Sequence, residues 1–456
     1  MGAVFIALFV VLALRQLWIQ VVEGPALADN RYNPRHATTA VGRGSILASD
    51  GTPLAVSRGD KRLYPQGALV AHAVGYASAR YGTSGLEDAF DRVLTPRGGA
   101  QDPFSQLTEM LASTHRPPRG ADVVTTLDLR VQRSLVAQLQ RYPRAAGIVI
   151  DPRTGAVLAI ASVPSYDPNA LDARWAQLLA DPASPLLDRS TSGLYPPGST
   201  FKIVTVSDAL DANVVTPAST FNDTGGLTIG NFTVRNDEEE VTGYQNLTGA
   251  FALSSNVDFA RVALTLGVDR WYEYAGRWGL GQPVEFDLPV ARDHVPPKAS
   301  ISPGILAQLG FGQASLLVTP MRMALVGTTI AHDGTTLRPY LVRRIAGSDT
   351  AIATRPETIA EPISADTARE VRELMIAVVQ RGTGTAARLP GVTVAGKTGK
   401  ATNPHGRSHA WFVAFAPAQA PRVAVAVVVE NVGYGGTYAA PIAREVLRVA
   451  LARSRT

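Results

Sequence analysis

Residues 195–202 read Tyr195-Pro196-Pro197-Gly198-Ser199-Thr200-Phe201-Lys202, and an apolar pattern with helical spacing follows them. The two prolines and the glycine end the preceding segment, which places Ser199 at a helix start. Ser199 and Lys202 then share one helix face, so the amine can reach the hydroxyl. The helix N-terminus adds positive potential and free N–H groups where an oxyanion would form. A neutral Lys202 would accept the serine proton, although an isolated Ser-x-x-Lys is more often an N-cap serine followed by a surface lysine.

The chain uses lysine sparingly, which gives each lysine weight. Lysine occurs only at Lys61, Lys202, Lys298, Lys397 and Lys400, whereas Lys and Arg together number 43. Arginine stays charged at any ordinary pH, but a lysine can be tuned into a neutral amine. Each lysine therefore raises the question of what arginine could not do at that position.

Two further motifs stand C-terminal to Lys202. Leu253-Ser254-Ser255-Asn256 contains Ser-x-Asn, and Ala395-Gly396-Lys397-Thr398-Gly399 contains Lys-Thr-Gly. Each is weak alone, because Ser-x-Asn is a common loop tripeptide and Lys-Thr-Gly also fits a turn. In this order after Ser-x-x-Lys they form the motif set of penicillin-interacting serine enzymes. Two of the few lysines fill the two lysine positions of that set, which argues against coincidence.

Composition places the chain in the globular class. Its 456 residues suffice for two or three domains of roughly 150 residues, or for one oversized domain. A hydrophobic share of 46% against 18% charged residues indicates a substantial core. The net charge of +5 is spread without long basic runs, so a nucleic-acid surface is not indicated. The absence of cysteine excludes thiol catalysis, thiolate metal sites and disulfides.

The hydrophobic pattern predicts an α+β domain whose sheet is closed by strands far apart in sequence. Helical spacing covers 129–139 and 365–380, within a mostly helical middle. Residues 23–120 are polar and broken by Pro and Gly, which indicates a small accessory domain. Strand-like runs occupy 123–127, 147–150, 156–163, 410–416 and 423–429.

An apolar N-terminal segment predicts a single transmembrane anchor over residues 1–22. Arg15 and Gln16 interrupt it, and Trp18 stands where an interfacial aromatic residue would lie. Two alternatives stay open. One is a signal peptide cleaved after the small-x-small run at 26–28, and the other is a buried core helix.

The three motifs resemble those of class B penicillin-binding proteins, the monofunctional peptidoglycan D,D-transpeptidases, and most of all the penicillin-binding protein A type of actinobacteria. The resemblance implies a membrane anchor at 1–22 and an accessory pedestal or dimerisation-like domain at 23–120. Residues 121–456 are then a serine β-lactamase-like transpeptidase domain, with an antiparallel sheet flanked by helices, outside the cytoplasmic membrane. Further matching runs are Arg43-Gly44-Ser45-Ile46-Leu47, Tyr81-Gly82-Thr83-Ser84-Gly85-Leu86-Glu87, Leu187-Asp188-Arg189, Gly312-Gln313, Val318-Thr319-Pro320, Arg381-Gly382-Thr383-Gly384-Thr385 and His409-Ala410-Trp411-Phe412.

The resemblance assigns catalytic roles to five side chains. Ser199 attacks the carbonyl between the two terminal D-alanines of a stem peptide, and Lys202 is its general base. Ser254 relays a proton to the leaving amine, Asn256 holds Lys202 and the substrate amide, and Lys397 supplies a positive field. An amine of a second stem peptide then completes the cross-link, and β-lactams stall at the acyl stage.

The resemblance places the substrate-binding groups on the Lys-Thr-Gly segment. The Thr398 hydroxyl binds the substrate carboxylate, Gly399 completes the motif, and the backbone N–H groups of Ser199 and Lys400 form the oxyanion hole. The family usually has Thr where this chain has Lys400. The oxyanion N–H survives any side chain, and the Lys400 ammonium either replaces the lost hydroxyl contact or faces solvent.

The expected partners are stem peptides, β-lactams, the membrane and a SEDS-type glycosyltransferase, without nucleic acid, cofactor or metal. Two other functions stay open: a D,D-carboxypeptidase or β-lactamase-like hydrolase, and a non-catalytic penicillin-binding sensor or scaffold. The acidic run 237–240 is expected to be a solvated loop, its functional alternative being a carboxylate that activates water. Gly382-x-Gly384-x-x-Ala387 follows a helical pattern rather than a strand, and His405 with His409 lacks a third ligand, so neither predicts a nucleotide or zinc site.

Overall fold

The computed structural model describes residues 42–96, 119–347, 352–403 and 406–452, together with Leu12, Arg15 and Trp18. The expected anchor at 1–22, apart from those three positions, and His405 lie outside the described residues. Within the described residues, no helix combines the length and the apolar character that a membrane span requires.

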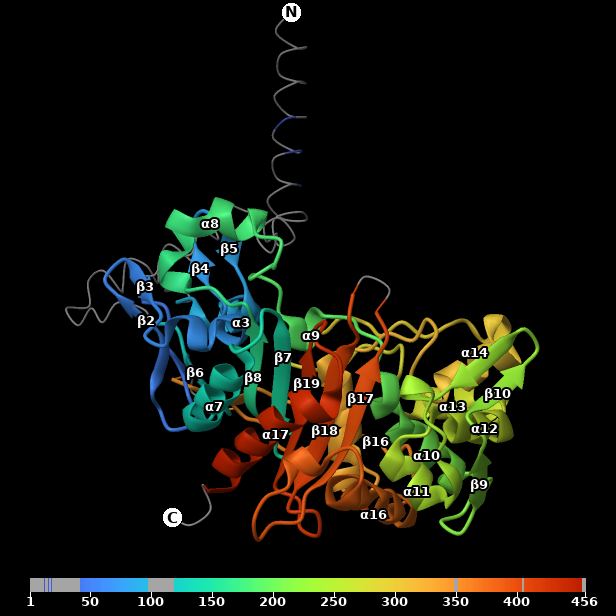
Figure 1. Cartoon of the computed structure of the whole chain (residues 1–456). Coiled ribbons are helices and arrows are strands. Elements are labelled where there is room, and N and C mark those ends of the chain that lie inside the picture. Colours follow the sequence, from blue (N-terminus) through green and yellow to red (C-terminus); the bar gives the residue numbers. More distant parts are fainter. Residues whose placement is uncertain are drawn as a thin grey trace, which may run out of the picture.

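A five-stranded antiparallel sheet forms the centre of the larger part of the molecule (Figure 1). Val427, near the C-terminal end of this part, pairs with Gly147, near its N-terminal end, so strands from the two ends meet inside the sheet. The predicted closure by sequence-distant strands is therefore confirmed. The strands, in spatial order, are β17 (Ala395–Ala401), β18 (His409–Ala416), β19 (Val423–Val429), β7 (Ala145–Ile150) and β8 (Val157–Val163).

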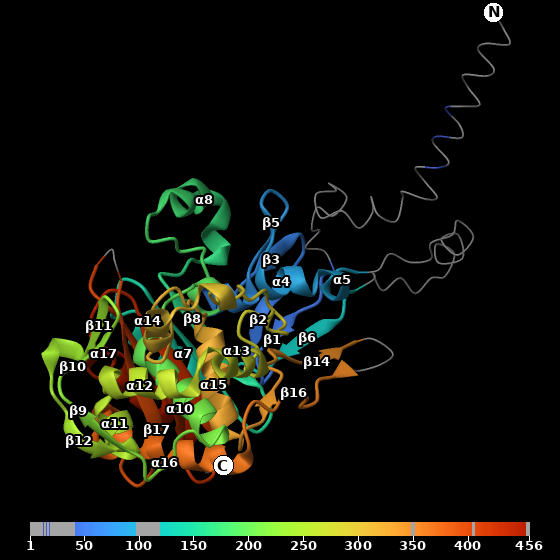
Figure 2. The same ribbon diagram turned by 90° about the vertical axis from the view of Figure 1, so that its right-hand side faces the viewer.

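Helices cover both faces of this sheet because its strands are apolar on both sides. In β19, Val425 and Val427 pack with one core cluster, whereas Ala426 and Val428 pack with the other. Figures 1 and 2 show the sheet between its helical layers. The first cluster includes α7 (Leu129–Leu139) and α17 (Gly435–Leu451), and the second includes α10 (Lys202–Asp211), α15 (Pro320–Ala331) and α16 (Ala365–Arg381).

A mainly helical lobe lies beside β17, on the opposite side of the sheet from the accessory elements (Figure 1). It carries two small antiparallel sheets of two strands each, the hairpin β10–β11 and the pair β9–β12. Its elements are β9 (Thr220–Asp223), β10 (Gly226–Ile229), β11 (Phe232–Arg235), β12 (Gly243–Asn246), α11 (Leu247–Leu253), α12 (Asn256–Leu266), α13 (Val268–Arg277) and α14 (Pro303–Leu309).

A second sheet joins the accessory region to the larger part (Figure 2). Strand β6 (Asp122–Thr125) pairs in parallel with β1 (Ile46–Leu47) and antiparallel with β14 (Val342–Ala346). The expected boundary between residues 120 and 121 thus falls next to a strand that both parts share. The other strands of this sheet are β2 (Pro53–Arg58), β3 (Lys61–Leu63) and β15 (Ile352–Ala353).

The accessory region is held by a buried ion cluster and by aromatic packing. Glu87 accepts hydrogen bonds from Arg43 Nε and Arg62 Nε, each at 2.7 Å. Tyr81 stacks on Trp175 with ring centroids 4.3 Å apart. The short elements here are α3 (Ala71–Val74), β4 (Ala77–Ser78), β5 (Gly82–Thr83), α4 (Gly85–Ala89) and α5 (Asp91–Leu94), with α8 (Leu171–Ala180) packed above them.

Candidate active site

The three motifs meet at one cavity of about 400 Å³ between β17 and the helical lobe. Ser199, Ser254 and Thr398 line it, one from each motif. The order of the three motifs in the sequence suggested that they serve one reaction, and the fold brings them together at one cavity.

Ser199 lies on a single 3-10 turn, Gly198–Phe201, that leads directly into α10. The helix start predicted at this position is confirmed, although its first turn is 3-10 rather than α. Gly198 has φ +53°, and a Cβ there would lie 2.4 Å from the backbone oxygen of Lys400. The glycine therefore lets the serine turn touch β17, the two segments expected to supply the oxyanion N–H groups.

Lys202 is fully buried behind Ser199. Its Nζ donates to the backbone oxygen of Ser254 at 2.6 Å and to Asn256 Oδ1 at 2.8 Å. Burial and the nearby charge of Lys397 hold the pKa of Lys202 well below its ordinary value. Within the described residues, Lys202 Nζ makes no hydrogen bond with Ser199 Oγ; its contacts run to the Ser-x-Asn segment, as expected for Asn256.

The Ser254 hydroxyl joins the two buried lysines. Its Oγ lies 2.8 Å from Lys397 Nζ and 3.2 Å from Lys202 Nζ. Burial lowers the pKa of Lys397 to about 7. Ser254 itself ends α11 in the left-handed region at φ 64°, a conformation that costs a non-glycine residue roughly 1–2 kcal/mol and is often stored at functional sites.

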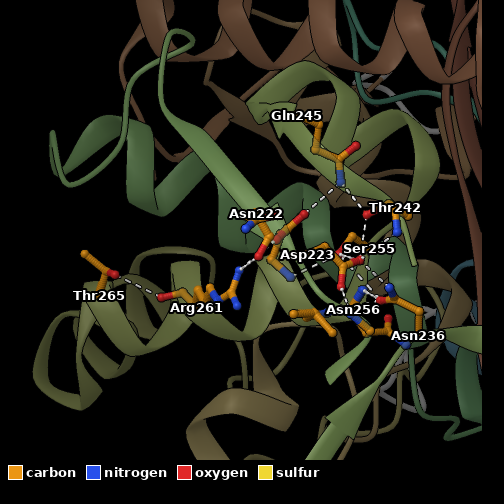
Figure 3. Close-up of polar contacts among 12 residues, drawn as sticks. Asn222, Asp223, Asn236, Thr242, Gln245, Ser255, Asn256, Arg261 and Thr265 are labelled. Atoms are coloured by element: carbon orange, nitrogen blue, oxygen red, sulfur yellow. Dashed lines mark hydrogen bonds and ion pairs between the residues drawn. The ribbon is translucent and has the colours of Figure 1, made fainter. Parts of the chain in front are cut away.

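Asn236 and Asp223 hold the Ser-x-Asn turn in place through hydrogen bonds (Figure 3). Asn236 Oδ1 accepts from the backbone N–H of Asn256 at 2.7 Å, and its Nδ2 donates to Asp223 Oδ2. Thr242 Oγ1 donates to the same carboxylate oxygen at 2.6 Å. Burial raises the pKa of Asp223, but hydrogen bonds from Thr242, Gly225 and Asn236 outweigh it, so the pKa lies below its usual value. We did not predict this network, because none of its members belongs to a motif.

Lys397, Thr398 and Gly399 lie on the edge strand β17 rather than in a turn. The Thr398 hydroxyl hydrogen-bonds that of Thr383, which belongs to the run 381–385 noted in the sequence. Gly399 pairs with Trp411, and a Cβ there would lie 2.9 Å from Thr200 Cγ2. Glycine is thus needed where the serine turn crosses the strand.

Comparison with known proteins agrees with this geometry. Residues 145–448 match the family model described as the penicillin-binding protein transpeptidase domain. The chain belongs to the penicillin-binding protein transpeptidase family. Residues 43–123 match the penicillin-binding protein A dimerisation domain.

Relatives of this transpeptidase are similar over most of their length. The peptidoglycan D,D-transpeptidase PbpA of Mycobacterium tuberculosis is 35% identical, with 98% of this chain and 96% of the relative covered. The peptidoglycan D,D-transpeptidase MrdA of Escherichia coli is 31% identical, with 82% and 69% covered. The penicillin G acyl-enzyme complex of M. tuberculosis penicillin-binding protein A superposes with a TM-score of 0.81 at 34% identity, covering 90% of this chain and 99% of that one.

Lys400 stands where the family usually has Thr, and its ammonium contacts residues on the other side of the cavity of this transpeptidase. Its Nζ lies 3.3 Å from Asp237 Oδ1 and 3.2 Å from the Tyr434 hydroxyl. The Tyr434 hydroxyl donates to Glu238 Oε1 at 2.6 Å. The acidic run 237–240 is exposed, as expected for a solvated loop, and two of its carboxylates, Asp237 and Glu238, also have partners across the cavity. Lys400 is also not simply solvent-facing, since only 27% of its side chain is exposed.

Proposed function

We propose that this penicillin-binding transpeptidase cross-links peptidoglycan stem peptides through an acyl-enzyme on Ser199. One observation carries the proposal: the Ser254 hydroxyl lies between two fully buried lysines, Lys202 and Lys397, at the cavity that Ser199 lines. Two amines around one hydroxyl form a path for a proton beside a serine nucleophile. The same route accounts for inhibition by β-lactams, whose strained amide acylates the serine in place of the peptide.

Acylation begins with Lys202 as the base. Its lowered pKa supports a neutral amine, which takes the proton from Ser199 Oγ as this oxygen attacks the carbonyl carbon of the penultimate D-alanine. The backbone N–H groups of Ser199 and Lys400 receive the developing oxyanion. The carbon–nitrogen bond then breaks, and the proton reaches the leaving amine through Ser254. Free D-alanine departs and leaves an ester on Ser199.

Deacylation reverses the proton path. An amine of a second stem peptide gives its proton to the Ser254–Lys202 pair and attacks the ester carbonyl, which forms the cross-link and restores the Ser199 hydroxyl.

Asn256 keeps Lys202 in place through the hydrogen bond to its Oδ1. Lys397 and the Thr398 hydroxyl bind the carboxylate of the donor. Pairing of Asp237 with Lys400 and of Glu238 with Tyr434 opposes a water-activating role for these two carboxylates.

The proposed setting is the outer face of the cytoplasmic membrane. The apolar run in residues 1–22 supports one uncleaved span that tethers the catalytic domain there. A SEDS-type glycosyltransferase that polymerises the glycan strand is the proposed partner. N-terminal sequencing of the mature protein tests the tether, because a chain beginning at Asp29 would show that the segment is cleaved.

Product analysis tests the activity. The full-length protein is incubated with a pentapeptide that ends in D-Ala-D-Ala and with an acceptor amine. We expect a cross-linked product together with released D-alanine, and neither from a Ser199→Ala variant. Release of D-alanine without a cross-link would identify a carboxypeptidase, and the absence of both products would contradict an enzymatic role.

A further inference from the structure

Four charged or polar side chains join the two walls of the catalytic cavity, and the proposed reaction uses none of them. Asp237 and Glu238 follow β11 on the helical lobe, whereas Lys400 lies on β17 and Tyr434 precedes α17. We refer to these four residues as the cross-pocket bridge. Three of them, Asp237, Lys400 and Tyr434, line the cavity together with Ser199.

The bridge is made of several contacts, not of one ion pair. The Lys400 ammonium lies 3.3 Å from the Asp237 carboxylate and 4.4 Å from the centroid of the Tyr434 ring, over which a cation is attracted. The Tyr434 hydroxyl connects Lys400 to Glu238. Burial lowers the pKa of Lys400, but Asp237 and Tyr434 outweigh burial and raise it, so the amine is a cation at neutral pH.

The loop that carries Asp237 has an unfavourable backbone. Glu238 and Glu239 have φ values of +55° and +59°, in the left-handed region that non-glycine residues seldom adopt. Asn236 anchors the loop by donating to the backbone oxygen of Glu240 at 2.8 Å. The chain thus accepts local strain at the place where the two carboxylates reach the opposite wall.

Lys400 also lies beside the proposed site for the donor carboxylate. Thr398 and Lys400 are two positions apart on β17, so their side chains leave the same face of the strand. Thr398 lines the cavity, and its hydroxyl is the proposed carboxylate ligand. The Lys400 ammonium is therefore at the end of the cavity where the donor carboxylate is proposed to bind. The Asp237 carboxylate already forms an ion pair with this ammonium.

We infer that Asp237 is a specificity-determining residue of this transpeptidase, because its carboxylate competes with the carboxylate of an acyl donor for the Lys400 ammonium. The inference rests on the site proposed above. An anionic donor must displace Asp237 from Lys400 or share the cation with it, whereas a neutral donor does neither. Asp237 acts through Lys400, so it is a positioning residue for the cation and does not take part in the bond-making steps.

The test compares an anionic with a neutral acylating agent. Second-order rate constants for acylation of Ser199 are measured with benzylpenicillin and with its uncharged methyl ester, in the wild type and in Asp237→Asn. We expect the ratio of the anionic to the neutral rate to rise about two- to fivefold, the range of one partly exposed ion pair. The ratio cancels any change in Lys202, because this lysine acts on both agents. Asp237 also raises the pKa of Lys397, so a loss of charge on Lys397 in Asp237→Asn would lower the ratio, opposite to the expected rise.

Two further variants distinguish the bridge from a general effect of charge. Glu239→Gln removes one negative charge from the same exposed loop, from a residue that makes no ion pair with Lys400 among the described residues, and should leave the ratio unchanged. In a Lys400→Thr background, Asp237→Asn should no longer change the ratio, because the cation for which it competes is gone. Thermal melting confirms that each variant is folded.

Three results would overturn the inference. These are an unchanged ratio in Asp237→Asn, an equal rise in Glu239→Gln, and a rise that persists in the Lys400→Thr background. If instead the proposed catalytic site were wrong, the wild-type protein would carry no penicilloyl group on Ser199. Wild-type protein that is acylated at Ser199 with no effect of Asp237→Asn would refute the inference alone.

Discussion

At the scale of single residues, the chemistry depends on two buried amines that share one hydroxyl. In the proposed reaction, Lys202 must be neutral to take a proton, and Lys397 must be charged to attract the donor carboxylate. Both lie without solvent exposure beside Ser254. The charge on Lys397 disfavours a second charge on Lys202, so the pair loses its first proton from Lys202. A single environment thereby gives two lysines different roles.

The different charge states of Lys202 and Lys397 predict how acylation depends on pH and on each lysine. Lys202→Arg should abolish acylation by benzylpenicillin, because arginine cannot act as a base. In the wild type, acylation should rise with pH as Lys202 loses its proton and fall as Lys397 loses its own at about pH 7. Lys397→Arg should retain part of the activity and lack the fall, because a guanidinium stays charged. Acylation rates measured across pH test this, and a fall that persists at the same pH in Lys397→Arg would contradict it.

Sequence reasoning could assign the motif residues but not their supports. Ser199, Lys202 and Lys397 were predictable because they stand in motifs whose order along the chain matches that of penicillin-interacting serine enzymes. Asp237 and Lys400 are far apart in the chain, and only the fold shows that they are 3.3 Å apart. Asn236 likewise bonds the backbone of Asn256, a contact that leaves no pattern in the sequence.

At the scale of elements, the site depends on close contact between the serine turn and β17. Gly198→Ala should lower the acylation rate by about 100-fold, since a displacement of roughly 1 Å in a reacting group can have that effect. The reason is the Cβ that would lie 2.4 Å from the Lys400 oxygen and push the turn away from the strand. The rate of penicillin acylation by the folded variant is the measurement.

Gly391 offers a matched control. It also has positive φ, at +71°, but a Cβ there would meet no atom within 4 Å. Gly391→Ala therefore carries the same kind of backbone penalty, roughly 1–2 kcal/mol, without the clash. It should melt at a lower temperature and acylate at the wild-type rate; equal loss of acylation in both variants would refute the close-contact argument.

Four of the five strands of the central sheet, β7, β8, β18 and β19, were predictable at this scale because they are apolar on both faces. Residues 423–429 are all buried, and the strand observed there has the predicted bounds. Strand β17 was not predicted as a strand. Two lysines and two glycines replace the apolar pattern in it, since its residues serve the cavity and the contact with the serine turn rather than the core.

At the scale of the whole molecule, the accessory region and the transpeptidase domain share the sheet in which β6 lies between β1 and β14. The sequence indicated an accessory domain from its composition. It could not show this pairing, because β1 and β14 are each only a few residues long and lie far apart in the chain.

The buried cluster around Glu87 should stabilise the accessory region without affecting catalysis. Glu87→Ala leaves Arg43 and Arg62 buried without their shared carboxylate, which costs about 3–5 kcal/mol for such pairs. Thermal melting should show a clear drop, and acylation measured below the melting range should match the wild type. Asp88→Ala, at the exposed neighbouring carboxylate, should change the melting temperature little. A stability loss as large in Asp88→Ala would contradict the role of the cluster.

The most direct test of the whole account is the position of the acyl group. Full-length protein is incubated with benzylpenicillin, digested, and the modified peptide is identified by mass spectrometry. We expect a single penicilloyl adduct on Ser199, in the 3-10 turn that leads into α10, and no adduct in Ser199→Ala. Recovery of the adduct on Ser254 or Ser255 would contradict the account.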